Sequence, residues 1–489
     1  MSYIEQSESV DEVAAEKLLP THKDQKNSQL LEWKEKIKQI SGSASFCILP
    51  WIHLATRPNG DMRICCVANA SGADSGDYKV GLVKKEDGEP ANFGKDLPTA
   101  AFNNDYMKSV RKLMLSGQIP ASCTKCFDEE DKGIVSKRVW ETGTWYLQEQ
   151  TDIKELIRET QEDGTVPHKL QYLDLRLGHT CNLKCIMCSP HDSSQWVNDH
   201  KTVYPLFTSE LIKKQMSWQQ DNFDNRWHEN PAFWEQIYEQ IPHIKQLYFA
   251  GGEPLLIKEH KAFLQEIIKR GHAHKIGLRY NTNGTLINEE IIEIWEQFKK
   301  VKVGISMDAI GDRLHYIRFP TDSSQVEKNL WRLERTSEKI QTNIALAVQI
   351  LNIKHVPDFI KWKISCGFKK LNFDTNAAGQ ITGGGLVGVH LLWIPTWLSI
   401  RVLPKEDKAH VRQLFAELKE WLWNHYTQDS EFWEKNPYGW KRWEGILDWM
   451  DATDHTNLLP DFKQYIEKMD QHRKTDFRLT FPEISHLIK

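Results

Sequence analysis

From residue 170 onward the chain alternates between strand-like and helix-like segments, and this alternation limits its possible folds more than any other feature. Leu173, Leu175 and Leu177 recur at every second position, the spacing of one face of a β-strand. Further strand-like segments lie at residues 244–252, 275–284, 301–309, 343–352 and 369–377. Helical patterns or long connections follow them. This order predicts an α/β fold with a parallel sheet, closed most simply as a partial (β/α)6 TIM-like barrel with its chemistry at the carboxyl ends of the strands.

The segments on either side of the barrel region, residues 165–380, differ from it in character. Residues 1–40 are a polar leader that ends in an amphipathic helical pattern. Residues 41–150 are rich in turn signals and contain five of the nine cysteines, so we expect a small domain held together by metal ligation. Residues 390–489 have helical patterns and eight tryptophans, which lie between Trp393 and Trp449. We therefore expect a Trp-rich helical C-terminal domain.

Charge and hydropathy exclude several kinds of partner. Lys and Arg number 63 against 67 Asp and Glu, which gives a net charge of −4, so no general basic field favours long nucleic acid. No run of 18 apolar residues occurs, and the first 20 residues are acidic and polar. We expect a soluble, cytoplasmic protein with no membrane partner.

Three cysteines follow the first expected barrel strand at the spacing Cys181-x3-Cys185-x2-Cys188. Three thiolates this close together can bind three irons of a four-iron, four-sulfur cluster and leave the fourth iron open. The open iron can take the amino and carboxylate groups of S-adenosylmethionine, whose sulfonium then lies beside the cluster. A zinc knuckle or structural cluster with a distant fourth ligand is the alternative.

This motif and its surroundings resemble the radical S-adenosylmethionine (SAM) superfamily. Residues 251–254 match its GGEP segment, residues 282–284 its TNG segment, and residues 306–308 its SLDG segment in part. Two departures are Met187, where the family often has an aromatic residue, and the lack of a legible GxIxGxxE element in residues 347–355. The resemblance implies a cofactor seat in which backbone carbonyls at the glycines approach the methionine amine closely. Its positions are Gly251, Gly252, Glu253, Asn283, Ser306, Asp308 and Arg318.

The N-terminal cysteines resemble a second type of module. Cys47-x12-Gly60-x4-Cys65, followed by Cys123-x2-Cys126, is similar to the auxiliary-cluster domains called twitch and SPASM. The resemblance implies that Cys47, Cys65, Cys123 and Cys126 bind one auxiliary four-iron cluster, with Cys66 adjacent. In better-known relatives this module follows the barrel, whereas here it precedes it. A structural zinc site with four cysteine ligands is the competing interpretation.

Together these features predict a radical SAM enzyme. The resemblance implies reductive cleavage of SAM to a 5′-deoxyadenosyl radical, with one electron from flavodoxin or ferredoxin, and hydrogen abstraction from a substrate inside the barrel. Peptide or protein modification is the favoured substrate class, and a nucleotide is the runner-up. A noncatalytic iron-sulfur electron carrier or a zinc-stabilised adaptor belongs to another functional class, and neither requires the GGEP, TNG and SMD segments.

Overall fold

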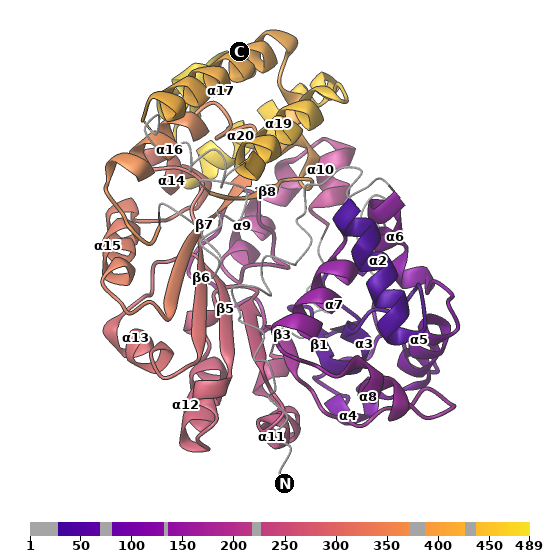
Figure 1. Cartoon of the computed structure of the whole chain (residues 1–489). Helices are drawn as coiled ribbons and strands as arrows, with labels where there is room; N and C mark the ends of the chain where they lie inside the picture. Colours follow the sequence, from indigo (N-terminus) through magenta and orange to yellow (C-terminus); the bar gives the residue numbers. More distant parts are fainter. Residues whose placement is uncertain (1–27, 69–80, 132–134, 218–225, 372–386, 426–436) are drawn as a thin grey trace.

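The computed structural model describes residues 28–68, 81–131, 135–217, 226–371, 387–425 and 437–489 (Figure 1). Within these ranges, eight strands form one sheet in the order β2-β1-β3-β4-β5-β6-β7-β8. Neighbouring strands from β1 to β8 run parallel, and only β2 is antiparallel to its neighbour. The protein is therefore an α/β protein whose mostly parallel sheet is consistent with a partial barrel.

The strands are short, and helices separate most of them. The strands are β1 His53–Thr56, β2 Met62–Arg63, β3 Tyr172–Arg176, β4 Gln246–Ala250, β5 Gly277–Thr282, β6 Lys300–Ser306, β7 Ile340–Val348 and β8 Gly388–Leu391. The α-helices before β4 are α2 Ser28–Ser41, α3 Leu49–Ile52, α4 Pro98–Phe102, α5 Asp105–Leu115, α6 Thr124–Asp131, α7 Lys137–Leu147, α8 Ile153–Arg158, α9 Trp196–Val203, α10 Glu210–Gln215 and α11 Pro231–Gln240. Those after β4 are α12 Lys258–Lys269, α13 Glu289–Trp295, α14 Gly311–Ile317, α15 Ser323–Glu334, α16 Val356–Ser365, α17 Lys405–His425, α19 Pro437–Asp451, α20 Leu459–Arg473 and α21 Phe477–Thr480.

Five of the six expected barrel strands are confirmed as β3 to β7. The sixth was expected at residues 369–377, of which residues 369–371 belong to a turn and the others lie outside the described residues. The strand that pairs with β7 is instead β8, through Ala345 opposite Gly388. Four residues that begin with glycine show too little alternation to be recognised as a strand from the sequence.

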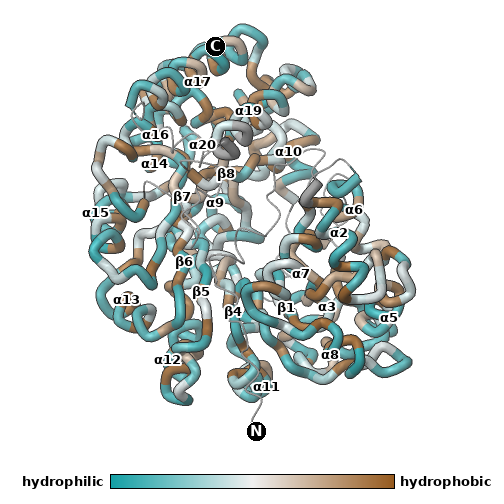
Figure 2. The backbone as a smooth tube through the Cα atoms, viewed as in Figure 1, coloured by the Kyte–Doolittle hydropathy of each residue, from teal (hydrophilic) through white to brown (hydrophobic). Residues whose placement is uncertain are grey.

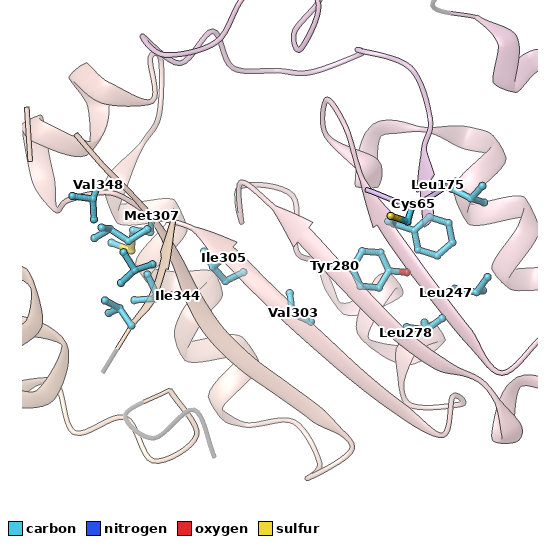
Figure 3. Packing of buried hydrophobic residues seen from close by; sticks show 14 of the residues in the cluster. Cys65, Leu175, Leu247, Leu278, Tyr280, Val303, Ile305, Met307, Ile344 and Val348 are labelled. Atoms are coloured by element: carbon cyan, nitrogen blue, oxygen red, sulfur yellow. The ribbon is translucent and has the colours of Figure 1, made fainter. Parts of the chain in front are cut away.

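Apolar side chains from one face of the sheet pack beneath the helices. Leu247, Leu278 and Val301 are matched across β4, β5 and β6, and all three are buried. Figure 3 shows Leu247, Leu278, Val303 and other buried residues packed along these strands. Along α12, α13 and α15, hydrophilic and hydrophobic residues alternate, as Figure 2 shows, which is the pattern of helices with one buried side.

The segments before and after the barrel strands are built onto the same sheet. Strand β1 pairs with β3, with Leu54 opposite Leu173, so N-terminal residues extend the sheet beyond β3. The N-terminal elements lie beside β1 and β3, and α17, α19 and α20 lie near β8 (Figure 1). The domain boundaries expected from the sequence stay predictions. In the ranges that the structure describes, every helix is too short or too polar to cross a membrane.

Because Leu54 is fully buried where β1 meets β3, its truncation should weaken the barrel as well as the N-terminal segment. We expect Leu54→Ala to lower the free energy of unfolding by about 2 to 5 kcal/mol, because it leaves a cavity between the strands. Leu31→Ala, at a position 66% exposed, should change it little and is the matched control. Urea unfolding followed by tryptophan fluorescence gives the energies, and hydrogen exchange locates the effect. Unchanged exchange in β3 would contradict the coupling.

Candidate functional site

The cysteine loop follows β3 and is held by a segment from the far side of the sheet. Its backbone N–H groups at Lys184 and Ile186 donate to the carbonyls of Phe319 and Ile317, at 2.6 and 2.8 Å. These backbone hydrogen bonds alternate along the loop as in a β-ladder, although neither segment is a strand. They place Cys181, Cys185 and Cys188 beyond the carboxyl edge of the sheet, where the sequence predicted them.

Two of the three thiols in this loop contact each other. The Cys188 thiol donates to Sγ of Cys185, which lowers the pKa of Cys185 to about 7, and the guanidinium of Arg318 acts in the same direction against burial. The same hydrogen bond, together with burial, raises the pKa of Cys188 well above its usual range. Burial also raises the pKa of Cys181, to about 12. Cys185 is therefore the thiol most readily deprotonated for metal binding.

Arg318 connects the cysteine loop to the end of β6. Its Nε lies 2.7 Å from Oδ2 of Asp308, and its Nη1 lies 3.9 Å from Sγ of Cys185. The other Asp308 oxygen accepts from the N–H of Ala347 at 2.7 Å. Asp308 is fully buried, so its role in this structure is to orient Arg318 and the end of β7. Removal of either partner would leave a buried charge without its counter-ion, so the pair holds β6 and the end of α14 in one relative position.

Two glycines after β4 allow its end to approach the cysteine loop. A Cβ on Gly252 would lie 2.3 Å from the carbonyl oxygen of Thr180, and Gly251 has φ +117°. The backbone N–H of Glu253 donates to the same Thr180 carbonyl at 2.8 Å. The glycines are thus required by contact with the loop, whereas the sequence analysis explained them by contact with a ligand amine.

Glu253 is buried beneath the site and binds the end of β5. Its carboxylate accepts from the Thr282 hydroxyl and from the N–H of Asn283, each at 2.8 Å. The Asn283 amide in turn donates to Oδ1 of Asn182, inside the cysteine loop, at 2.8 Å. Burial raises the pKa of Glu253 to about 7, although these hydrogen bonds oppose the shift. The Glu253 carboxylate therefore connects the ends of β4 and β5. The hydrogen bond from Asn283 to Asn182 connects both to the cysteine loop.

The structure places all seven predicted seat residues at this one edge of the sheet. Gly251, Gly252 and Glu253 follow β4, Asn283 follows β5, and Asp308 follows β6. Ser306 is the last residue of β6 and is half-buried, and Arg318 ends α14. Their roles as cofactor ligands stay predictions.

Sequence reasoning missed the residues that brace the cysteine loop. Trp196 Nε1 donates to the carbonyl of Cys185, and the Tyr465 hydroxyl donates to that of Ile186, both at 2.7 Å. Beside them, buried Asp199 is 2.7 Å from Lys184 Nζ and 3.2 Å from Arg473 Nε. Tyr465 and Arg473 belong to α20, so a C-terminal helix supports the loop. No local motif marks the contacts of α20, because Tyr465 and Arg473 lie 279 and 274 positions from their partners.

The N-terminal cysteines line one pocket, separate from the catalytic cysteine loop. Its lining includes the sulfur-bearing residues Cys47, Cys65, Cys123, Cys126 and Met114. The four cysteines predicted as auxiliary-cluster ligands are therefore brought together from three separate parts of the sequence. Burial raises the pKa of all four thiols, so metal binding at neutral pH would displace protons.

A buried ion pair fixes one wall of this cavity. Arg138 donates through Nε to Glu130 Oε1 at 3.0 Å, and its Nη1 donates to the carbonyl of Phe46 at 2.9 Å. Phe46 precedes Cys47, and Glu130 lies in α6 with Cys126. The pair therefore sets the distance between two of the cysteines.

The cysteine donor sets can bind iron-sulfur clusters, in which each thiolate binds a different iron. Four thiolates could instead bind one zinc ion in a tetrahedron, with bond lengths of about 2.3 Å. Cys47, Cys65, Cys123 and Cys126 line one pocket, so their side chains can meet a common metal group.

Comparison with known proteins agrees with this geometry. Residues 175–362, from β3 to α16, match the family model of the Radical SAM superfamily. These residues include the cysteine loop, the predicted seat and the strands that carry them. Over residues 175–362 the chain is therefore a radical SAM enzyme.

Individual relatives are distant. An uncharacterized protein of Methanocaldococcus jannaschii is 28% identical over 212 residues, 42% of this chain and 62% of that protein. A GTP 3′,8-cyclase of Clostridium botulinum is 22% identical over 214 residues, 42% of this chain and 57% of that protein. The chain thus matches less than two thirds of either relative. Among solved structures, anSMEcpe with bound AdoMet has 20% identity and a TM-score of 0.35, with 53% of this chain and 62% of that chain covered.

The buried Glu253 predicts a specific dependence of stability on pH. Because burial raises its pKa from 4.5 to about 7, the folded apoprotein holds this proton more tightly than the unfolded chain. The contribution to stability is complete below pH 4.5 and is lost as the pH rises through 7. The free energy of unfolding of the wild type, minus that of Glu253→Gln, should therefore fall by about 3 kcal/mol between pH 4.5 and 8.

Urea unfolding of the two apoproteins across this range measures that difference. Other titrating groups, including the buried histidines, are common to both proteins and cancel. Glu239→Gln is the matched control at an exposed helix position, and its difference from wild type should not vary with pH. A wild-type advantage over Glu253→Gln that is constant with pH would refute the raised pKa.

Proposed function

We propose that this enzyme reductively cleaves SAM at a four-iron, four-sulfur cluster held by Cys181, Cys185 and Cys188, and that it abstracts hydrogen from a substrate within the barrel. The observation that carries the proposal is the convergence of these thiols with Glu253 and Arg318 at one sheet edge. When bound, the cluster supplies the electron that converts SAM to methionine and a 5′-deoxyadenosyl radical. An electron donor such as flavodoxin or ferredoxin would reduce it.

The chain's own groups would orient the cofactor. Glu253 would accept a hydrogen bond from the methionine amine, since three N–H or O–H groups occupy only part of its accepting capacity. Arg318 is available to a carboxylate through the part of its guanidinium that Asp308 does not bind. Ser306, half-buried at the strand end, would meet the ribose. Enclosure of these groups would limit access of water to the reacting atoms.

Cys47, Cys65, Cys123 and Cys126 would hold the second, auxiliary four-iron cluster. The common cavity that these residues line supports this part of the proposal. Complete ligation by protein would leave this cluster to transfer electrons or to shape access to the barrel. With such a module, a peptide or protein substrate is our first candidate. A nucleotide is the second, favoured by the GTP 3′,8-cyclase of Clostridium botulinum among the relatives.

Cysteine substitutions would separate the two proposed clusters. Anaerobically reconstituted wild type should contain about eight irons and form 5′-deoxyadenosine with SAM and dithionite. Cys181→Ala should keep about four irons and form no 5′-deoxyadenosine, because its catalytic cluster lacks a ligand. Cys65→Ala should also lose about four irons, those of the auxiliary cluster. Iron and sulfide analysis with chromatographic detection of 5′-deoxyadenosine measures these outcomes.

Cys366→Ala is the matched control, because Cys366 follows α16 and lies apart from both groups of cysteines. It should retain the iron content and product of the wild type. Zinc in place of iron, or iron without cleavage of SAM under several reductants, would overturn the proposed function.

A further inference from the structure

The face of the sheet opposite the helices carries a row of polar and charged side chains that includes Arg279. Strand register aligns Asp174 of β3 with Tyr248 of β4, Tyr248 with Arg279 of β5, and Arg279 with Lys302 of β6. Alternate residues of a strand point to opposite faces of its sheet. These four side chains therefore belong to one row across the sheet interior.

The orientation of Arg279 follows from the residues beside it. Tyr280 contacts α12 through the 2.8 Å hydrogen bond between its hydroxyl and His260, and it packs on Trp295 of α13. Leu278, on the same face as Tyr280, is buried (Figure 3). Arg279 points away from these helices, into the inner side of the curved sheet.

Arg279 lacks a direct counter-ion. Within the described residues it makes no hydrogen bond or ion pair, and the ring of Tyr248 lies beside it, with 6.0 Å from Cζ to the ring centroid. The side chain is solvent-exposed, although it lies at the middle of a central strand. A permanent guanidinium charge in such a position is costly unless a partner or water solvates it.

The carboxylates around Arg279 are already paired with other cations. Asp174 lies 3.7 Å from Nε of Arg176, and Glu141 of α7 lies 2.6 Å from Nζ of Lys137. Each acid is therefore balanced by a cation of its own. Arg279 is therefore left without an ion pair in the part of the chain that the structure describes.

From this arrangement we infer that the substrate carries an oxyanion, a carboxylate or a phosphate, which binds to Arg279 on the inner face of the sheet. The planar guanidinium matches either group with two parallel hydrogen bonds. Arg279 lies four residues before Asn283 in β5, about 13 Å along the strand from the predicted cofactor seat. The anion would anchor one end of the substrate while another part reaches that seat. This inference rests on the proposed function for its view of the barrel interior as the substrate chamber.

Two simple anions can test the site without knowledge of the substrate. Pyrophosphate and glutarate are titrated by calorimetry into the reconstituted holoprotein at low ionic strength. We expect at least one to bind, and the preference between them distinguishes a phosphate from a carboxylate. Arg279→Gln should weaken the dissociation constant by about 10-fold or more, since it removes a charged hydrogen-bond donor. Arg279→Lys should give a smaller loss, because an ammonium keeps the charge but not the planar pair of donors.

The matched control is Arg158→Gln, at an arginine whose side chain is 75% exposed on α8. It should bind the anions as the wild type does. Iron content and circular dichroism verify that each variant is folded, and Arg279→Lys serves if Arg279→Gln does not fold. Failure of the wild type to bind either anion at millimolar concentration, or unchanged binding by both Arg279 variants, would overturn the inference.

Formation of 5′-deoxyadenosine by the wild type is measured on the same preparation. Anion binding that depends on Arg279, without formation of this product, would remove the proposed function and leave the anion site in place. Formation of 5′-deoxyadenosine without anion binding would remove the anion site and leave the proposed function in place. The two hypotheses can therefore fail separately.

Discussion

The predicted catalytic site depends on how a loop without regular structure is held at the edge of the sheet. Residues 181–188 have no helix or strand to fix them, so contacts from other elements hold the three thiols in place. Backbone bonds to Ile317 and Phe319 supply this restraint on one side, and Trp196 and Tyr465 supply it on another. The thiols are thus positioned by contacts from α9, the end of α14 and α20, three elements that are far apart in sequence.

Buried charges strengthen the same arrangement. Asp308 pairs with Arg318 below Cys185, and Asp199 pairs with Lys184 and Arg473 beside the loop. Each carboxylate contacts groups from different elements, so a shift of one element would leave a charge without its partner. The energetic cost of that shift makes such pairs better at selecting one arrangement than at adding stability. The loop therefore has a single favoured position relative to β6 and α20.

Much of this fold could be predicted from the sequence because its main signals are local. Strands β3 to β7 have enough alternating residues to be recognised, and the spacing of Cys181, Cys185 and Cys188 is itself chemical information. Strand β8 is too short for such a pattern, and β1 became part of the sheet only through its pairing with β3. The role of Tyr465 could not be read at all, since it depends on packing between residues 279 positions apart. The glycines after β4 were assigned correctly to the site edge but for a different physical reason.

The N-terminal segment lines the pocket of its own cysteines and also pairs with the sheet. Strand β1 lies directly beside β3, and α7 carries Glu141, which acts electrostatically on Arg279. The same helix begins with Lys137, which lines the cavity of the N-terminal cysteines. One helix thus carries a residue that lines this pocket and a residue that acts electrostatically on Arg279. Because β1 pairs with β3, the N-terminal segment is held next to the sheet whatever its redox role.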